Sequence, residues 1–220
     1  MNAMDFSFAG AQLRALPSGA LHWPEHALLV VSDLHLGKSD RIARRNGNML
    51  PPYETRDTLL RLDADIAATA PETVLCLGDS FDDPVAAASL SEEDRMWITR
   101  LQAGRSWIWI EGNHDPGGIG LGGSHRETLT EGPLTFRHIA RTDANGEVSG
   151  HYHPKVQIIA RGRMVSRRCF LIDQSRMILP AYGTFTGGLR TTDKALTSLM
   201  GSDAEAILVG DSLHRLPMPR

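Results

Sequence analysis

Three short apolar runs in the first half of the chain, each followed at once by polar residues, most constrain its fold. They are residues 27–32 (ALLVVS), 73–77 (TVLCL) and 106–110 (SWIWI). Each run is too short for a helix, and an unbroken apolar run of this length is typical of a strand buried on both faces. The polar residues that follow the three runs are Asp33, Gly78 with Asp79, and Glu111 with Gly112 and Asn113.

Helical patterns separate these runs. Residues 54–70 place Leu59, Leu62 and Ile66 on one face, and Ser91 is a typical N-cap for a helix that ends near Ala103. The order strand, helix, strand, helix, strand predicts a parallel α/β sheet. Ligands of such sheets bind at the carboxyl ends of the strands, where the polar residues lie.

The second half changes to short predicted strands, and residues 5–22 at the start of the chain predict a hairpin. The strands are expected at residues 134–139, 147–149, 156–160, 169–172, 177–180 and 206–209, and one helix at 193–200. We therefore expect a second sheet that packs on the first, within a single domain over residues 1–220.

Composition excludes several classes of protein. Lys and Arg total 23 against 26 for Asp and Glu, so the formal charge of −3 excludes a simple basic nucleic-acid binder. No run of about 18 apolar residues is present, and the first residues do not have the basic and apolar pattern of a secretion signal. We expect a cytoplasmic protein with no membrane partner.

Five short segments place Asp, His or Asn beside the predicted strands, and their joint occurrence predicts a metal site. The segments hold Asp33 and His35, Asp79 and Asp82, Asn113 with His114 and Asp115, His138, and His151 with His153. Imidazole and oxygen donors that converge from several strand ends suit Mn, Fe or Zn. Two divalent ions close together repel each other unless a carboxylate lies between them, and Asp79 is the candidate for that bridge.

The five segments resemble the pattern of the calcineurin-like metallophosphoesterases. That pattern is Asp-x-His, Gly-Asp-x-x-Asp, Gly-Asn-His-Asp/Glu, a single His and Gly-His-x-His, and the chain matches every element in order. The resemblance implies a four-layer αββα sandwich of two mixed sheets flanked by helices. It also implies two bound divalent ions, for which we expect Mn²⁺, with Fe, Zn and Ni as alternatives.

The resemblance assigns a role to each matched residue. Asp33, His35 and His153 would bind the first ion, and Asn113, His138 and His151 the second, with Asp79 on both. His125 is the alternative to His138, because an isolated His beside a strand is a weak signal. A hydroxide that bridges the ions would attack phosphorus.

Three further residues are expected to assist the reaction. His114 would donate to the leaving oxygen, and Asp115 would hold the His114 ring through its other nitrogen. Asp82 is expected to orient a metal ligand.

The chain also resembles one branch of the family, the bacterial ligase-associated DNA-damage-response endonucleases. Residues 37–51 and the segment 180–189 (PAYGTFTGGL) carry this likeness. It implies a DNA phosphodiesterase or endonuclease in DNA repair, in a complex with an ATP-dependent DNA ligase, a helicase and an exonuclease. A homodimer is left open.

Two basic clusters receive different interpretations. Lys38, Arg41, Arg44 and Arg45 follow the first metal motif, and we expect them to contact substrate phosphate. Arg161, Arg163, Arg167 and Arg168 are expected in a solvated turn.

Two other functions stay open at this point. The same metal site could act on small nucleotides or lipid-linked diphosphates, as a phosphodiesterase or pyrophosphatase. Alternatively, the chain could be a non-catalytic scaffold for a DNA ligase or helicase, although all the metal positions of the pattern are filled.

Overall fold

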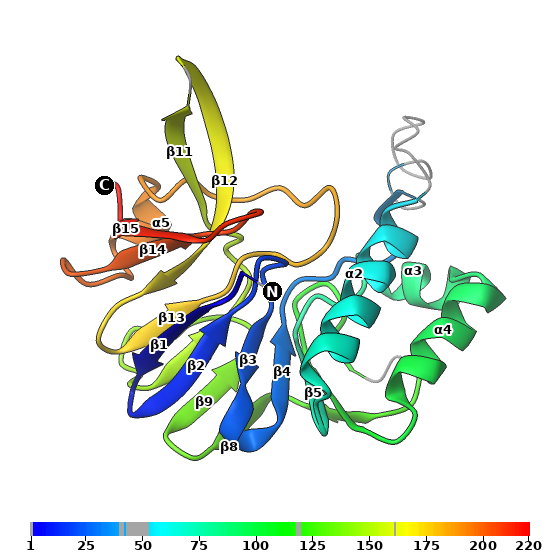
Figure 1. Cartoon of the computed structure of the whole chain (residues 1–220). Coiled ribbons are helices and arrows are strands. Elements are labelled where there is room, and N and C mark those ends of the chain that lie inside the picture. The colour runs from blue at the N-terminus through cyan, green and yellow to red at the C-terminus, as the bar shows by residue number, and fades with distance from the viewer. Residues whose placement is uncertain (1, 40–41, 43–52, 118–119, 161) are drawn as a thin grey trace.

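The computed structural model describes residues 2–39, 42, 53–117, 120–160 and 162–220, and in it two mixed β-sheets face each other (Figure 1). The first sheet has the order β1-β2-β3-β4-β5-β6-β7. Its strands are β1 (Met4–Phe8), β2 (Ala11–Ala15), β3 (Leu21–Trp23), β4 (Leu28–Val31), β5 (Thr73–Leu77), β6 (Ser106–Ile110) and β7 (Ser124–Arg126). The first four are antiparallel, and β4 to β7 run parallel.

The second sheet has the order β15-β14-β12-β13-β10-β9-β8, and β11 pairs with β12 outside this order. Its strands are β8 (Thr128–Glu131), β9 (Leu134–Arg137), β10 (Glu147–Ser149), β11 (Lys155–Ala160), β12 (Arg163–Ile172), β13 (Arg176–Ile178), β14 (Glu205–Leu208) and β15 (His214–Pro217). The pairs β9–β10 and β10–β13 are parallel, whereas the others are antiparallel.

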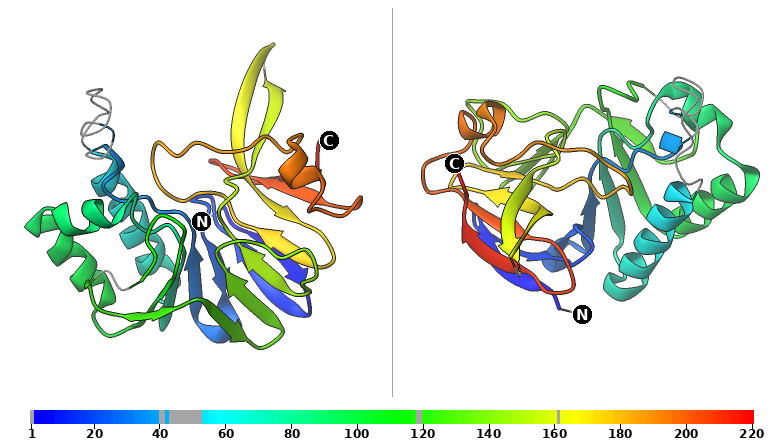
Figure 2. Two further views of the ribbon diagram at one scale, coloured as in Figure 1. Left: turned by 180° about the vertical axis from the view of Figure 1, so that it is seen from behind. Right: turned by 90° about the horizontal axis from the view of Figure 1, so that it is seen from above.

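Helices cover the outer faces of both sheets unequally (Figures 1 and 2). The first sheet is covered by α2 (Glu54–Thr69), α3 (Pro84–Ser89) and α4 (Glu92–Gln102). The Ser91 hydroxyl caps α4 by accepting from the Asp94 N–H at 3.1 Å. The second sheet carries only the short helix α5 (Lys194–Thr197) among the described residues, and Leu196 packs there with Met200.

The main core lies between the two sheets. Phe136 and Phe170 from the second sheet pack in one cluster with Leu75 and Ile110 from the first, and all are buried. A second cluster lies under the helices, which is why β4 and β5 are buried on both faces, as their unbroken apolar runs predict.

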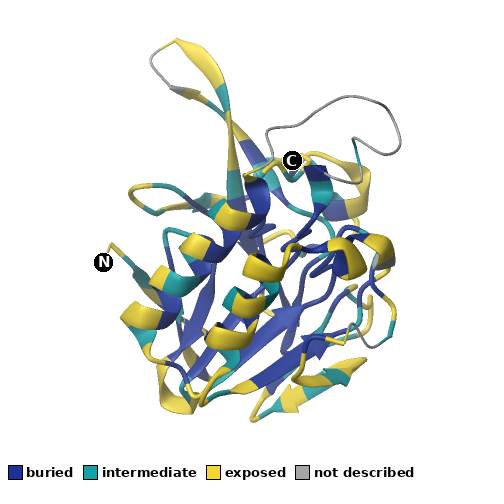
Figure 3. Ribbon diagram, turned by 90° about the vertical axis from the view of Figure 1, so that its right-hand side faces the viewer, coloured by how far each residue is buried: buried dark blue, intermediate teal, exposed yellow. Residues whose placement is uncertain are grey.

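The hairpin of β11 and β12 projects from this body (Figures 1 and 3). Its placement corrects one prediction, because Arg163, Arg167 and Arg168 lie on the strand β12 and not in a turn. Arg161 lies outside the described residues.

The two-sheet, helix-flanked α/β fold is confirmed. The bounds of β5, β6 and β10 are those expected, whereas α3, β7, β8 and β15 were not predicted. Within the described segments, no helix combines the length and apolarity that a membrane crossing requires.

The core between the sheets generates a first prediction. Phe136→Ala should lower the free energy of unfolding by about 3–5 kcal/mol, because the ring is fully buried and its loss leaves a cavity. Urea denaturation measures this. Met96→Ala is the control, since Met96 is exposed on α4 and its change should be within about 0.5 kcal/mol.

Candidate metal centre

The parallel strands of the first sheet end at the same edge and deliver Asp33, Asp79 and Asn113 there. Val31 pairs with Cys76, and Leu77 with Ile110, so β4, β5 and β6 end in register. The loops that follow are joined directly, because the Asp33 N–H donates to the Gly78 carbonyl at 3.2 Å and the His35 N–H to the Asp79 carbonyl at 3.0 Å.

The second sheet brings its histidines to this edge in the same way, through parallel strands that end in register. β9 and β10 are parallel, with Val148 opposite Phe136, so the residues after the two strands meet. The Gly150 N–H donates to the His138 carbonyl at 3.0 Å. His138 and the segment from His151 to His153 thus face the loops of the first sheet.

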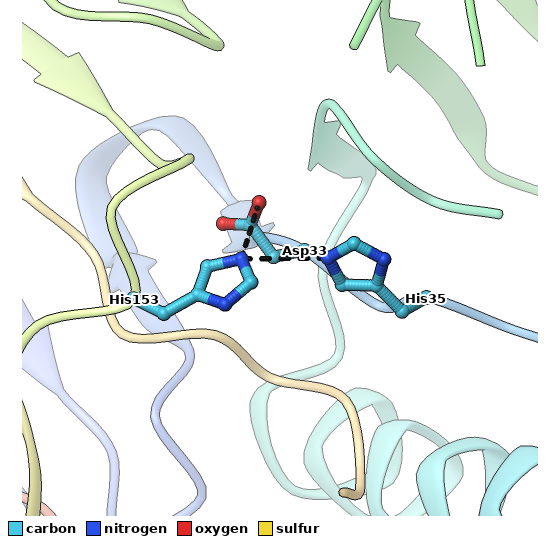
Figure 4. Close-up of side chains that lie close together, drawn as sticks. All are labelled: Asp33, His35 and His153. Carbon is cyan, nitrogen blue, oxygen red and sulfur yellow. Dashed lines mark hydrogen bonds and ion pairs between the residues drawn. The ribbon is translucent and has the colours of Figure 1, made fainter. Parts of the chain in front are cut away.

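The first cluster consists of Asp33, His35 and His153 (Figure 4). His153 Nε2 lies 3.1 Å from Asp33 Oδ1 and 3.4 Å from His35 Nε2. Two imidazole nitrogens that face each other at this distance need a proton or a cation between them. This donor set of one carboxylate and two imidazoles fits a divalent transition metal.

The second cluster consists of Asp79, His138 and His151, with Asn113 beside it. His138 Nε2 lies 3.2 Å from Asp79 Oδ2 and 3.0 Å from Asn113 Oδ1. His138 Nδ1 faces the Leu77 carbonyl at 3.0 Å, so this hydrogen bond fixes the ring and leaves Nε2 directed at the cluster. The donors again suit a divalent metal.

The structure separates His138 from its alternative, His125. His125 lies on the short strand β7, where its ring stacks on Trp109 with centroids 6.4 Å apart. Among the described residues it belongs to none of the groups whose donor atoms converge, whereas His138 does.

Asp82 contacts the His35 ring on the side away from His153. Its carboxylate lies 2.8 Å from His35 Nδ1, so the other nitrogen, Nε2, faces His153. Lys38 Nζ lies 3.9 Å from the same carboxylate. Asp82 and Lys38 therefore lie beside the first cluster, whereas Arg41, Arg44 and Arg45 are outside the described residues.

The contacts of His114 and Asp115 correct the expected pairing between them. His114 Nδ1 lies 2.9 Å from the Asp82 carbonyl, which holds the ring in place of a carboxylate. The Asp115 carboxylate instead accepts from the N–H groups of Ser80, Phe81 and Gly112, at 2.7, 3.1 and 3.2 Å. Asp115 thus ties the loop after β6 to the loop after β5.

Burial and close neighbours shift the ionisation of this centre in opposite directions. Burial alone would raise the pKa of Asp79, but the hydrogen bond and charge of His138 and the His114 N–H lower it to about 2. Burial opposes a charge on His138, yet Asp79 and Asp33 raise its pKa to about 9. Burial and the Asp79 charge raise the pKa of Asp115 to about 6, against the effect of its N–H donors.

The backbone of the centre is held in a conformation that side-chain-bearing residues rarely adopt. Nine described non-glycine residues have positive φ, and five of them belong to the two clusters. These five are Asp33 (φ 53°), His35 (46°), Asp79 (46°), His151 (70°) and His153 (47°). Each costs about 1–3 kcal/mol, and such strain concentrates at functional sites.

The segment 180–189 is bonded to the first metal motif. The Tyr182 N–H donates to the Ser32 carbonyl at 2.7 Å, and the Gly183 N–H to the Asp33 carbonyl at 3.1 Å. Two residues further on, Phe185 is exposed and lies 5.9 Å from the exposed ring of Tyr53. No sequence pattern links these two aromatic residues, because they are 132 positions apart in the chain.

Gly150 generates a second prediction. A Cβ at this position would lie 1.9 Å from Ser32 Oγ and 2.6 Å from Asp33 Oδ2. Gly150→Ala should therefore displace Asp33 and lower metal binding at least tenfold, as titration of the apoprotein with Mn²⁺ would measure. Gly187→Ala is the control, because a Cβ there meets no atom within 4 Å; equal metal affinity in both variants would contradict the prediction.

Comparison with known proteins agrees with this geometry. A family model described as calcineurin-like phosphoesterase matches residues 26–164, more than half of the chain. The crystal structure of Pseudomonas putida nuclease MPE is similar, with a TM-score of 0.77 and 28% identity over 98% of this chain and 100% of that one. A predicted phosphoesterase from Streptococcus pneumoniae TIGR4 has a TM-score of 0.34 and 12% identity over 86% and 95% of the two chains. No curated protein matches.

Proposed function

The chain belongs to the calcineurin-like phosphoesterase family, and we propose that this metal-dependent phosphoesterase is a nuclease that hydrolyses phosphodiester bonds in DNA. The observation that carries the proposal is the convergence of two Asp/His clusters at the carboxyl ends of the strands of both sheets. The similarity to a nuclease over nearly the whole of both chains favours nucleic acid as the substrate.

Each cluster is proposed to hold one divalent ion. Asp33, His35 and His153 would hold the first ion, Asn113, His138 and His151 the second, and Asp79 would contact both. We propose Mn²⁺, because imidazole together with hard carboxylate and amide oxygens suits this class of ion. When bound, such ions polarise a phosphate group and lower the pKa of water.

His114 is proposed to protonate the leaving oxygen. The Asp82 carbonyl can only accept, so His114 Nδ1 donates to it, and Nε2 is the ring atom left for the substrate. The His114 ring packs edge-on against His35, with centroids 5.2 Å apart, and therefore lies beside the first cluster. Asp115 would act on His114 through the backbone that it anchors.

Other parts of the proposal concern the surroundings of the site. Lys38 lies at the first cluster and would attract substrate phosphate, as would Arg41, Arg44 and Arg45. The proposed setting is DNA repair in the cytoplasm beside an ATP-dependent DNA ligase, a helicase and an exonuclease, with residues 1–220 as one domain. The resemblance of the segment 180–189 supports this setting.

Two substitutions separate the metal-binding and proton-transfer roles. His114→Ala should keep its metal content and lose about 10²–10⁴ in kcat on DNA, because it removes only the proton donor. Asp79→Ala should lose both metal and activity. Metal analysis beside a DNA-cleavage assay measures both properties, with His125→Ala as the unaffected control; full activity in either His114→Ala or Asp79→Ala would refute the assignment.

The substrate class is tested by competition. Hydrolysis of bis(p-nitrophenyl) phosphate with Mn²⁺ should be inhibited competitively by linear or nicked DNA, and the same preparation should cleave DNA only when Mn²⁺ is present. If the protein hydrolyses the small diester but DNA neither inhibits this reaction nor is cleaved, the site would instead be assigned to a small nucleotide or a lipid-linked diphosphate.

A further inference from the structure

The projecting hairpin leaves the body of the protein at the metal centre. We call Lys155–Ala160 of β11 and Arg163–Arg168 of β12 the arm. β11 begins two residues after His153, so the arm continues directly from the first cluster. It is held at its root by β12, whose last four residues pair with β14 in the second sheet.

The arm exposes two apolar side chains as a pair. Ile159 and Met164 are 79% and 70% exposed, the highest values among the large hydrophobic residues of the described chain. They are directly opposite each other in the register, and side chains of such a pair lie on the same face of the hairpin. Together, Ile159 and Met164 present an apolar pair to solvent.

The same face is basic at its root, beside the metal centre. Lys155 is directly opposite Arg168, and each lies four residues along its strand from the apolar pair, on the same face of the hairpin. Lys155 Nζ donates to the Thr186 carbonyl at 3.0 Å, and an Arg168 guanidinium N–H to the Ala181 carbonyl at 2.7 Å. Lys155 and Arg168 therefore lie against the segment 180–189, which is bonded to the first metal motif.

The opposite face carries two unpaired arginines. Arg163 and Arg167 are both exposed, and no carboxylate among the described residues forms an ion pair with either guanidinium. Residues 155–172 hold five basic residues and no acidic one, although the whole chain has a formal charge of −3. This concentration of positive charge favours an anionic partner.

We propose that the arm is a nucleic-acid-binding element, in which Ile159 and Met164 pack against bases while Arg163 and Arg167 contact phosphates. A two-stranded β-ribbon fits the major groove of DNA, where apolar side chains contact base edges such as the thymine methyl group. Arg163 and Arg167 are on the other face of the ribbon, from which their long side chains would reach the phosphates at the edges of the groove. Lys155 and Arg168, at the root of the arm, then supply positive charge between this contact and the metal centre. The proposal rests on the nuclease function above and adds a binding surface outside the catalytic residues.

Two arm variants test it. In Ile159→Ser/Met164→Ser the apolar pair is removed, and in Arg163→Gln/Arg167→Gln two charges are removed. The control for the first is Leu60→Ser/Met96→Ser, exposed apolar residues of α2 and α4. The control for the second is Arg95→Gln/Arg105→Gln, which also lack a carboxylate partner among the described residues.

The readout is kcat/KM for cleavage of a single-stranded oligonucleotide and of its duplex, with Mn²⁺, over a range of KCl. Both arm variants should lose about tenfold at low salt on at least one of the two substrates, and the two substrates distinguish which form of DNA the arm contacts. The arginine variant should also lower the slope of log kcat/KM against log salt by about 0.7–0.9 per contact, and the apolar variant should leave it unchanged. All variants should hydrolyse bis(p-nitrophenyl) phosphate at the wild-type rate, because the metal centre is intact.

The proposal is overturned if both arm variants keep the wild-type kcat/KM on DNA and the wild-type salt slope. The same holds if the substitutions change only the oligomeric state of the protein. The failure of the nuclease function looks different. If the wild-type protein cleaves neither DNA nor the small diester, the proposed function fails and the role of the arm fails with it.

Discussion

The connection between the two sheets at the metal centre depends on the hydrogen bonds of the buried Asp33 carboxylate. Its side chain accepts the His151 N–H from the second sheet at 3.0 Å and the Ser32 hydroxyl at 2.5 Å. Its backbone pairs with Gly78 on one side and Gly183 on the other. A carboxylate that is shielded from solvent keeps its charge only when such donors bind it. The charged group that suits a metal therefore also holds the loops of the two sheets together.

The strained backbone of the centre has the same origin. Strands that end in register would send their loops away in parallel directions, but the left-handed residues turn the chain sharply at Asp33 and Asp79. The side chains can then converge from separate strands. Close approach at Gly150, where no Cβ fits, completes the arrangement. The cost of these conformations is met by the hydrogen bonds between loops and by the packed core below them.

Much of this centre could be predicted from sequence, because its residues lie in short motifs at the ends of strongly apolar runs such as 73–77 and 106–110. The strand β7 could not be predicted, because a three-residue edge strand has no periodicity. The hydrogen-bond partner of His114 could not be predicted either, because a backbone carbonyl has no sequence signature. The basic run in β12 is predicted as a solvated turn, because it has no acidic residue among its arginines and charge runs usually face water. Only its pairing with β11 supplies the strand geometry.

β12 is one uninterrupted strand, and its register passes without a bulge from its pairing with β11 to its pairing with β14. The hairpin is therefore a lever whose short end is embedded in the core through Phe170 and Ile172. A displacement of its far end would therefore be transmitted along β12 to the second sheet. The loop after β10 of that sheet holds His151 and His153, so the orientation of the hairpin and the positions of these two side chains are mechanically connected.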